Sequence, residues 1–238
     1  MKKLSYCCCL ILVALFFTVN CEKATHGSEK TKPQKSLLVY IGVDGSGSYN
    51  YLDNAKERMK KVIDYLPDGA QVNIRWITEN SYLPKNAIES LTLPRIRTKH
   101  NENMFKMDAK LAQLKFKKET EQLKNQFLMK ILQAPFPNSR HTDILGFLLL
   151  CSERINNYRK ECTKYIIMFT DLKNNVQKYR KYLDDSSLKD THIFILSYEH
   201  TDHELKQKWE RNLQQWGAFP GYYYGPDEDF PNFFKEGL

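Results

Sequence analysis

The amino-acid sequence predicts a three-layer α/β domain built on a doubly wound, mostly parallel β-sheet of five or six strands. The first observation is that apolar runs of strand-forming residues alternate along the chain with stretches whose apolar residues recur every three or four positions. Strands that alternate with helices in this way form parallel sheets with helices on both faces. The second observation is that 42% of the 238 residues are apolar and 13% are aromatic, which is enough to bury the core of one domain with appendages.

The predicted elements begin with a β-α-β unit. Residues 37–43 form a continuous apolar run, which is typical of a central strand buried on both faces. Residues 51–66 follow as an amphipathic helix stopped by Pro67 and Gly69, and residues 72–78 alternate between apolar and polar side chains as a second strand. The later elements are an edge strand within 87–96, a long helical stretch at 101–134 inside an insertion of about 97–135, helices at 143–158, 176–183 and 202–216, and strands at 165–170 and 192–198.

Residues 1–21 have the pattern of a targeting signal. Two lysines follow Met1, and the apolar run from Leu10 to Phe17 is short for a membrane span. The sequence Thr18-Val19-Asn20-Cys21, followed directly by polar residues, resembles a bacterial lipoprotein box, which implies that Cys21 is acylated. An uncleaved anchor and an ordinary signal peptide are the alternatives, and each of the three exports the rest of the chain. We therefore expect an extracytoplasmic protein held at a membrane.

Residues 22–36 are polar and without periodicity, so we expect a flexible tether between this signal and a domain at 37–216. The net charge is +8 and the pI is about 9.0, but 36 basic residues are scattered among 28 acidic ones. No long basic block is available to follow a phosphate backbone, so nucleic acid is not an expected partner. A basic balance suits a protein near an anionic membrane surface.

Only two cysteines, Cys151 and Cys162, lie beyond the signal segment. Two cysteines do not build a zinc site. In an oxidising compartment they could pair as a disulfide that closes a short loop, and the alternative is a buried free thiol on a helix.

The turn after the first strand carries the strongest chemical signal. Ligands of doubly wound sheets bind at the carboxyl ends of the strands, and the sequence there is Asp44-Gly45-Ser46-Gly47-Ser48. Alternate positions in a tight turn direct three oxygen-bearing side chains, Asp44, Ser46 and Ser48, into one concavity. Hard oxygen ligands with one carboxylate among them suit Mg²⁺ or a similar ion such as Mn²⁺ or Ca²⁺.

At these residues the sequence resembles the von Willebrand factor A domain family, over about residues 37–216. That family builds its metal-ion-dependent adhesion site from Asp-x-Ser-x-Ser after the first strand, a threonine in a later loop and an aspartate after a later strand. Thr142 and Asp171 fit the last two positions. The resemblance implies that the serines and Thr142 touch the ion, that the aspartates hold it partly through water, and that a carboxylate from a protein partner completes the shell. It also implies a binding module for adhesion or assembly rather than an enzyme.

The sequence departs from the family pattern at two places. Leu172 follows Asp171 where the family commonly has glycine, and Arg140-His141 precede Thr142 where glycines are frequent. Asp143 is either a sixth oxygen donor or an acid that favours the start of a helix. A degenerate structural module without metal, part of an envelope or mobile-element machine, remains an alternative. So does an enzyme of another class, because residues 42–48 also resemble the first phosphate loop of actin-like sugar kinases, where that loop forms a hairpin into a second strand.

Two further segments allow two interpretations each. The long helical stretch either lies against the sheet with its lysines in solvent or projects as an arm toward a partner. The tail at 217–238 is rich in aromatic residues around an acidic Asp227-Glu228-Asp229. It either packs back over the sheet to complete the core or presents a docking surface.

Overall fold

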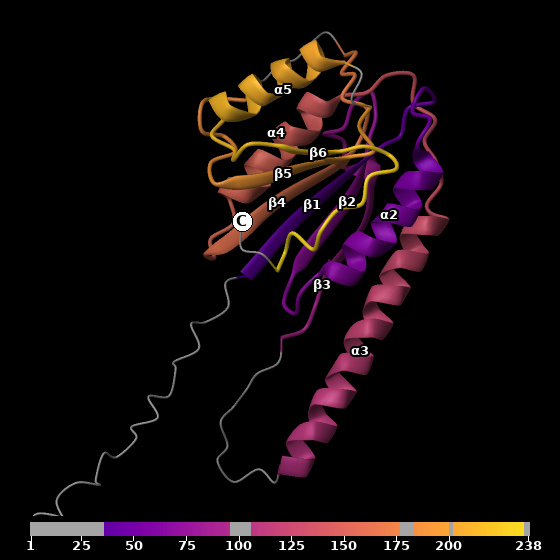
Figure 1. Cartoon of the computed structure of the whole chain (residues 1–238), viewed down its shortest axis with the longest axis vertical. Helices are drawn as coiled ribbons and strands as arrows, with labels where there is room; N and C mark the ends of the chain where they lie inside the picture. Colours follow the sequence, from indigo (N-terminus) through magenta and orange to yellow (C-terminus); the bar gives the residue numbers. More distant parts are fainter. Residues whose placement is uncertain (1–35, 96–105, 177–182, 200–201, 236–238) are drawn as a thin grey trace, which may run out of the picture. The chain divides into compact units, whose positions relative to one another are not determined.

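The computed structural model describes residues 36–95, 106–176, 183–199 and 202–235, and these form a six-stranded sheet with helices on both faces (Figure 1). The strand order is β3-β2-β1-β4-β5-β6, and every neighbouring pair is parallel except β2 and β3. The predicted fold class is therefore confirmed. The strands are β1 (Ser36–Asp44), β2 (Gln71–Ile77), β3 (Ala87–Thr92), β4 (Cys162–Phe169), β5 (Thr191–Leu196) and β6 (Tyr222–Tyr224).

Four helices cover the two faces of this sheet. In Figure 1, α4 (Ile144–Asn156) and α5 (His203–Gln215) lie on one side, and α2 (Leu52–Tyr65) and α3 (Lys106–Gln133) lie on the other. The continuous apolar run of β1 explains why both faces are covered, because its odd and even residues enter different cores. Val39 and Ile41 pack with α2 and α3, whereas Leu38 and Tyr40 pack with α4 and α5.

Helix α4 packs closely against the central strand at Gly42. A Cβ atom on Gly42 would lie 2.8 Å from ring atoms of Phe147, so only glycine fits at this point of β1. Asp143 begins the helix: its Oδ1 accepts a hydrogen bond from the backbone N–H of Gly146 at 2.7 Å. The expected role of Asp143 as the start of a helix is thus observed.

Helix α3 packs on the domain over its second half and is exposed over most of its first half. Near its end, Phe127, Leu128 and Ile131 are buried in the core shared with α2. Lys124 fixes this half, because its Nζ donates to the carbonyl oxygens of Asp64 and Leu66 at 2.9 and 2.7 Å, where α2 ends. From residue 108 to residue 119 nearly every side chain is exposed.

The aromatic tail belongs to the domain, so the expected boundary at residue 216 lies too early. Tyr222–Tyr224 pair with β5 as β6, and Phe230 and Phe233 are buried in the core of the α2 face. The tail therefore packs back over the sheet, because the edge of β5 and the apolar surface beside it need a cover that the earlier elements do not supply.

The remaining sequence predictions have different outcomes. The expected edge strand is observed as β3, although it ends at Thr92. The expected helix at 176–183 falls mostly on residues 177–182, and the signal segment with Cys21 falls on residues 1–35; both lie outside the described residues. Among the residues that are described, no helix combines the length and apolar character needed to cross a membrane.

Cys151 and Cys162 are free thiols in the structure. Cys151 is buried in α4, and burial raises the pKa of its thiol above the ordinary cysteine value. Of the two alternatives open from the sequence, the structure shows the buried thiol and not the disulfide.

Candidate functional site

The candidate site lies where the strand order of the sheet reverses. β1 runs beside both β2 and β4, and Val43 pairs with Phe169 in the parallel register. Asp44 therefore ends β1 next to Thr170 and Asp171, which follow β4. The carboxyl ends of the strands at such a switch point leave a crevice between the loops, which is where doubly wound sheets bind ligands.

The loop after β1 brings its three predicted oxygen donors together. Asp44 Oδ1 accepts a hydrogen bond from the backbone N–H of Ser46 at 2.9 Å, which folds the loop back over the carboxylate. The Oγ atoms of Ser46 and Ser48 lie 3.3 Å apart. Asp44 and Ser46 are buried and Ser48 is exposed, so the donor set opens to solvent on the side of Ser48.

Thr142 joins this group from the loop before α4. Its Oγ1 donates to Asp44 Oδ1 at 3.4 Å, although the two residues are 98 positions apart in the chain. Asn175 holds the threonine in place with two hydrogen bonds. Its side-chain Oδ1 accepts from the Thr142 backbone N–H at 2.6 Å, and its backbone N–H donates to the Thr142 carbonyl oxygen at 3.2 Å. The structure therefore brings Asp44, Ser46, Ser48 and Thr142 into one chain of contacts.

Asp171 lies beside this group but is engaged elsewhere. Its Oδ1 accepts from the backbone N–H of Lys173 at 3.0 Å, and its Oδ2 lies 3.2 Å from the Lys173 ammonium nitrogen. No hydrogen bond from Asp171 to the other four predicted residues is observed among the described residues. A cation at this site would therefore compete with Lys173 for the second aspartate.

Leu172 stands where the von Willebrand factor A family commonly has glycine. Its φ is +65°, in the left-handed region that costs a residue with a Cβ about 1–2 kcal/mol. Burial of the leucine side chain and a hydrogen bond from Trp209 Nε1 to the Leu172 carbonyl oxygen at 3.0 Å hold this conformation. The loop that carries Asp171 is thus fixed by packing.

Sequence reasoning missed Thr170. Its Oγ1 donates to Asp44 Oδ2 at 3.0 Å and accepts from the Leu172 N–H at 3.1 Å, and the side chain is fully buried. Thr170 thus orients the carboxylate of one predicted residue and the loop of another. Asn174 and Asn175 were missed as well, because their role depends on contacts with the loop before α4. The one available signal was a hydroxyl residue at the end of a strand, directly before an expected ligand.

The charges at the site favour a cation. Burial raises the pKa of Asp44 above the ordinary carboxyl value, and the nearby Asp171 carboxylate raises it further, while hydrogen bonds from Ser46 and Thr170 lower it. Burial removes the solvation of the Asp44 carboxylate, and Asp171 places a second negative charge near it without a counter-charge between them. A positive ion between the carboxylates would relieve both.

The residues present fit a hard divalent ion. They do not form a site of thiolates, imidazoles or several carboxylates: in the part of the chain that the structure describes, no group of three or more His, Cys, Asp or Glu side chains is placed to hold a metal. The donors here are hydroxyl and carboxylate oxygens, which suit Mg²⁺, Mn²⁺ or Ca²⁺ better than soft metals.

The kinase interpretation of residues 42–48 is wrong. The loop leads into helix α2, and β2 pairs parallel to β1 rather than returning as a hairpin. A hairpin was the feature that this interpretation required.

The sequence matches no protein-family model and no curated protein sequence. Solved structures do share the fold. A von Willebrand factor type A protein from Catenulispora acidiphila has a TM-score of 0.51 and 14% identity, over 81% of this chain and 39% of that one. An aerotolerance-related membrane protein from Bacteroides fragilis has a TM-score of 0.45 and 13% identity, over 85% of this chain and 96% of that one. Proximal thread matrix protein 1 from the mussel byssus, in a structure with a zinc-occupied MIDAS motif, has a TM-score of 0.42 and 15% identity, over 73% and 41%.

This chain thus spans well under two thirds of the Catenulispora and mussel proteins. Its identity to each is low, so the likeness concerns the fold. The strand order, the helices on both faces of the sheet and the likeness to the Catenulispora structure show that this chain has the fold of a von Willebrand factor A domain.

Proposed function

We propose that this chain is a protein-binding module for adhesion or assembly that acts through a divalent cation. Asp44, Ser46, Ser48, Thr142 and Asp171 hold the ion, and a carboxylate of the partner protein completes its coordination. The role is binding and not catalysis. Mg²⁺ is the first candidate ion because it accepts few carboxylates and retains several waters.

One observation carries this proposal. Four side chains that the sequence places in two distant segments contact each other around the buried carboxylate of Asp44. A purely structural loop needs no such set, since Thr170 and the Ser46 N–H already satisfy both oxygens of that carboxylate. The hydroxyls of Ser46 and Ser48 lie 3.3 Å from each other, and that of Ser46 also bonds to the Asp44 carboxylate, so both gather at one carboxylate, which supports ligand binding.

Mg²⁺ titration followed by thermal stability tests the cation. A ligand that binds only the folded state stabilises it by about 2.7 kcal/mol at a hundred times its dissociation constant. We expect Mg²⁺ to raise the melting temperature of the wild type. Ser48→Ala should abolish the shift without changing the stability in chelator, because Ser48 is exposed.

Ser90→Ala is the matched control, since Ser90 is an exposed serine on β3. It should keep the full response to Mg²⁺. An unchanged melting temperature of the wild type with Mg²⁺, Mn²⁺ and Ca²⁺ would show that the module works without metal. Stabilisation that requires a nucleotide in addition would contradict the binding role.

We also propose that the chain is exported and tethered to a membrane through residues 1–21, with acylation at Cys21. The lysines, the short apolar run and the cysteine followed by polar sequence support this. Several acyl chains together anchor stably, since each buried methylene contributes about 0.8 kcal/mol. Cys21→Ala should move the protein from the detergent-extracted membrane fraction to the soluble fraction, whereas retention in the membrane would indicate an uncleaved anchor.

A further inference from the structure

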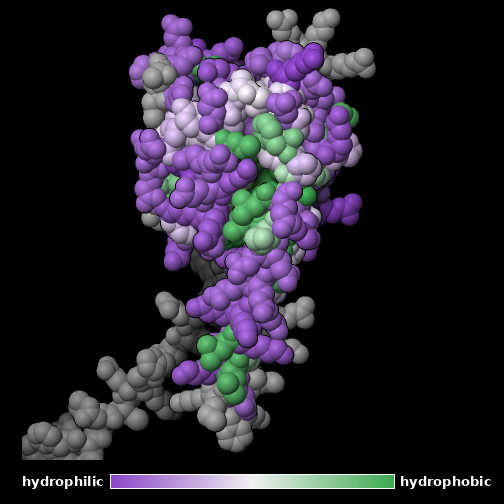
Figure 2. Space-filling view, turned by 90° about the vertical axis from the view of Figure 1, so that its right-hand side faces the viewer, coloured by the Kyte–Doolittle hydropathy of each residue, from purple (hydrophilic) through white to green (hydrophobic). Residues whose placement is uncertain are grey.

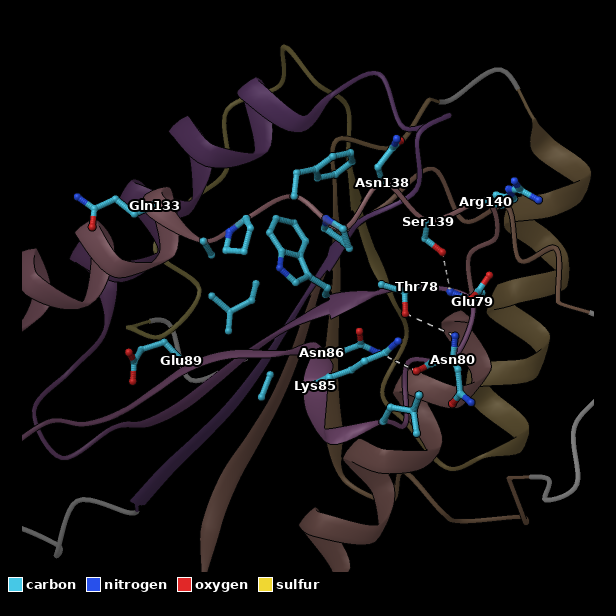
Figure 3. A pocket seen from close by; sticks show the side chains of 18 of the residues that line it. Thr78, Glu79, Asn80, Lys85, Asn86, Glu89, Gln133, Asn138, Ser139 and Arg140 are labelled. Carbon is cyan, nitrogen blue, oxygen red and sulfur yellow. Dashed lines mark hydrogen bonds between the residues drawn. The ribbon is translucent and has the colours of Figure 1, made fainter.

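A large cleft opens beside the candidate site, between β3 and the segment 134–140 that connects α3 to α4. Its volume is about 950 Å³, which is at the upper end for ligand pockets and exceeds the need of a single side chain. Figure 3 shows Asn138, Ser139 and Glu79 at one end of the cleft and Gln133 and Glu89 toward the other.

The cleft is continuous with the site through Ser139. This residue forms an isolated parallel bridge with Ser46: its carbonyl accepts from the Gly47 N–H at 3.0 Å, and its N–H donates to the Gly45 carbonyl at 2.8 Å. The Ser139 hydroxyl also accepts from the Glu79 N–H at 3.0 Å. One end of the cleft therefore lies a single strand spacing, about 5 Å, from Ser46 of the site.

The middle of the cleft is apolar. Phe136, with 37% of its surface exposed, packs edge-on against Trp76 with ring centroids 5.7 Å apart. A β-bulge shapes the opposite wall, because Ile74 pairs with Glu89 and Arg75 with Ala87, which leaves Ile88 as an extra residue in β3. Figure 2 shows apolar side chains gathered where α3 meets the body of the domain. An exposed aromatic residue beside a buried tryptophan offers a surface for another apolar side chain.

The rim of the cleft favours an acidic ligand. Lys85 and Arg140 are exposed, and Arg140 lies at the end nearest the site (Figure 3). Glu89 is compensated by Lys130, whose Nζ lies 3.0 Å from its Oε2. This leaves two cationic rim residues against Glu79, so the rim complements a segment that carries negative charge.

We infer that this cleft binds the part of the partner's chain next to the acidic residue held at the cation. The ligand is an extended peptide segment of a protein, with an aromatic or large aliphatic side chain about two to four residues from an aspartate or glutamate. This inference rests on the proposed metal-dependent function. It adds the class of sequence that the site selects.

The spacing follows from the geometry of an extended chain. Each extended residue advances about 3.3 Å, so two to four residues cover about 7 to 13 Å. Ser139 pairs with Ser46 across one strand spacing, and Phe136 stands three residues before Ser139 in the chain, so a segment of this length suits the path from Ser46 past Ser139 to Phe136. The acid supplies attachment at the ion, and the apolar side chain supplies selectivity, since desolvated aromatic contacts carry much of the energy of protein interfaces.

The test uses a peptide library with a fixed aspartate and randomised positions on both sides, selected on the full-length protein in Mg²⁺ and in chelator. Ala87→Trp fills the cleft from an exposed position, and Phe136→Ala removes its apolar wall. Leu114→Ala is the matched control, because Leu114 is an exposed apolar residue on α3 outside the cleft. Thermal stability in Mg²⁺ is followed for each variant, so that loss of the ion is distinguished from loss of the cleft.

We expect Mg²⁺ to enrich peptides with an apolar residue two to four positions from the aspartate. Ala87→Trp and Phe136→Ala should lower the affinity of these peptides at least about fivefold and abolish the flanking preference, while the need for Mg²⁺ and aspartate remains. Binding that needs Mg²⁺ and aspartate without any flanking preference, or a preference that Ala87→Trp leaves unchanged, overturns this inference and leaves the proposed function standing. Absence of any Mg²⁺-dependent enrichment contradicts both.

Discussion

Replacement of Thr170 by valine tests the side chain that holds the Asp44 carboxylate in place. The change keeps the size and branching of the side chain but removes the hydroxyl that donates to Asp44 Oδ2 at 3.0 Å and accepts from the Leu172 N–H at 3.1 Å. A hydrogen bond to a charged group contributes about 1.5–3 kcal/mol, and a buried N–H left without a partner costs about 1–3 kcal/mol. Allowing for relaxation of the loop, we expect Thr170→Val to lower the free energy of unfolding in chelator by about 3 kcal/mol.

The same variant should weaken Mg²⁺ binding. Mutation of a residue that orients a metal ligand typically lowers the metal affinity by about 10- to 100-fold. Thr170 orients Asp44 in this way. Urea unfolding followed by tryptophan fluorescence measures the stability, and calorimetric titration measures the affinity. Thr170→Ser is the control, because it keeps the hydroxyl and loses one methyl group, worth about 0.8 kcal/mol. If the valine variant matches the serine variant in both stability and affinity, the hydrogen bonds of Thr170 do not support the site.

Three further predictions follow from the charges and the core. Because burial raises the folded-state pKa of Asp44 above its unfolded value, the contribution of Asp44 to stability in chelator should be fully present below the ordinary carboxyl pKa and fall as pH rises through the folded-state pKa. Asp44→Asn should remove this fall and be the more stable protein at neutral pH in chelator, yet the less stable one in Mg²⁺; parallel pH profiles for the two proteins would contradict this. Lys173→Met should raise the Mg²⁺ affinity about fivefold, since two unit charges about 4 Å apart in water interact by about 1 kcal/mol. An unchanged titration would show that Lys173 does not compete for Asp171. Phe233→Ala should cost about 3–5 kcal/mol in urea unfolding, because Phe233 is fully buried against Phe194 with centroids 4.1 Å apart, whereas a small loss would mark the tail as an appendage.

The elements of the central sheet could be predicted because their signals are local. The apolar run that became β1 and the amphipathic spacing of α2 are properties of adjacent residues, and burial on one or both faces leaves them visible in sequence. The end of the domain could not be predicted in this way. Tyr222, Tyr223 and Tyr224 give no alternation that marks a strand, and they form β6 because β5 offers an unpaired edge.

The residues of the candidate site could also be predicted only in part from local sequence. Asp44, Ser46 and Ser48 stand within one turn, and their alternation with glycine was enough to predict their convergence. Thr142 could be placed only through resemblance, since no local rule connects it with Asp44 across 98 positions.

The sequence by itself determined which residues form the central sheet and which turn gathers oxygen ligands, because periodicity and turn chemistry act between neighbours along the chain. Only the tertiary structure decided that Thr170 supports Asp44, that Lys173 occupies Asp171, and that the segment before α4 forms a cleft against β3. These contacts join residues whose closeness is set by the register of β1 beside β4 and by the packing of α3 on β3, and neither is encoded within any single segment.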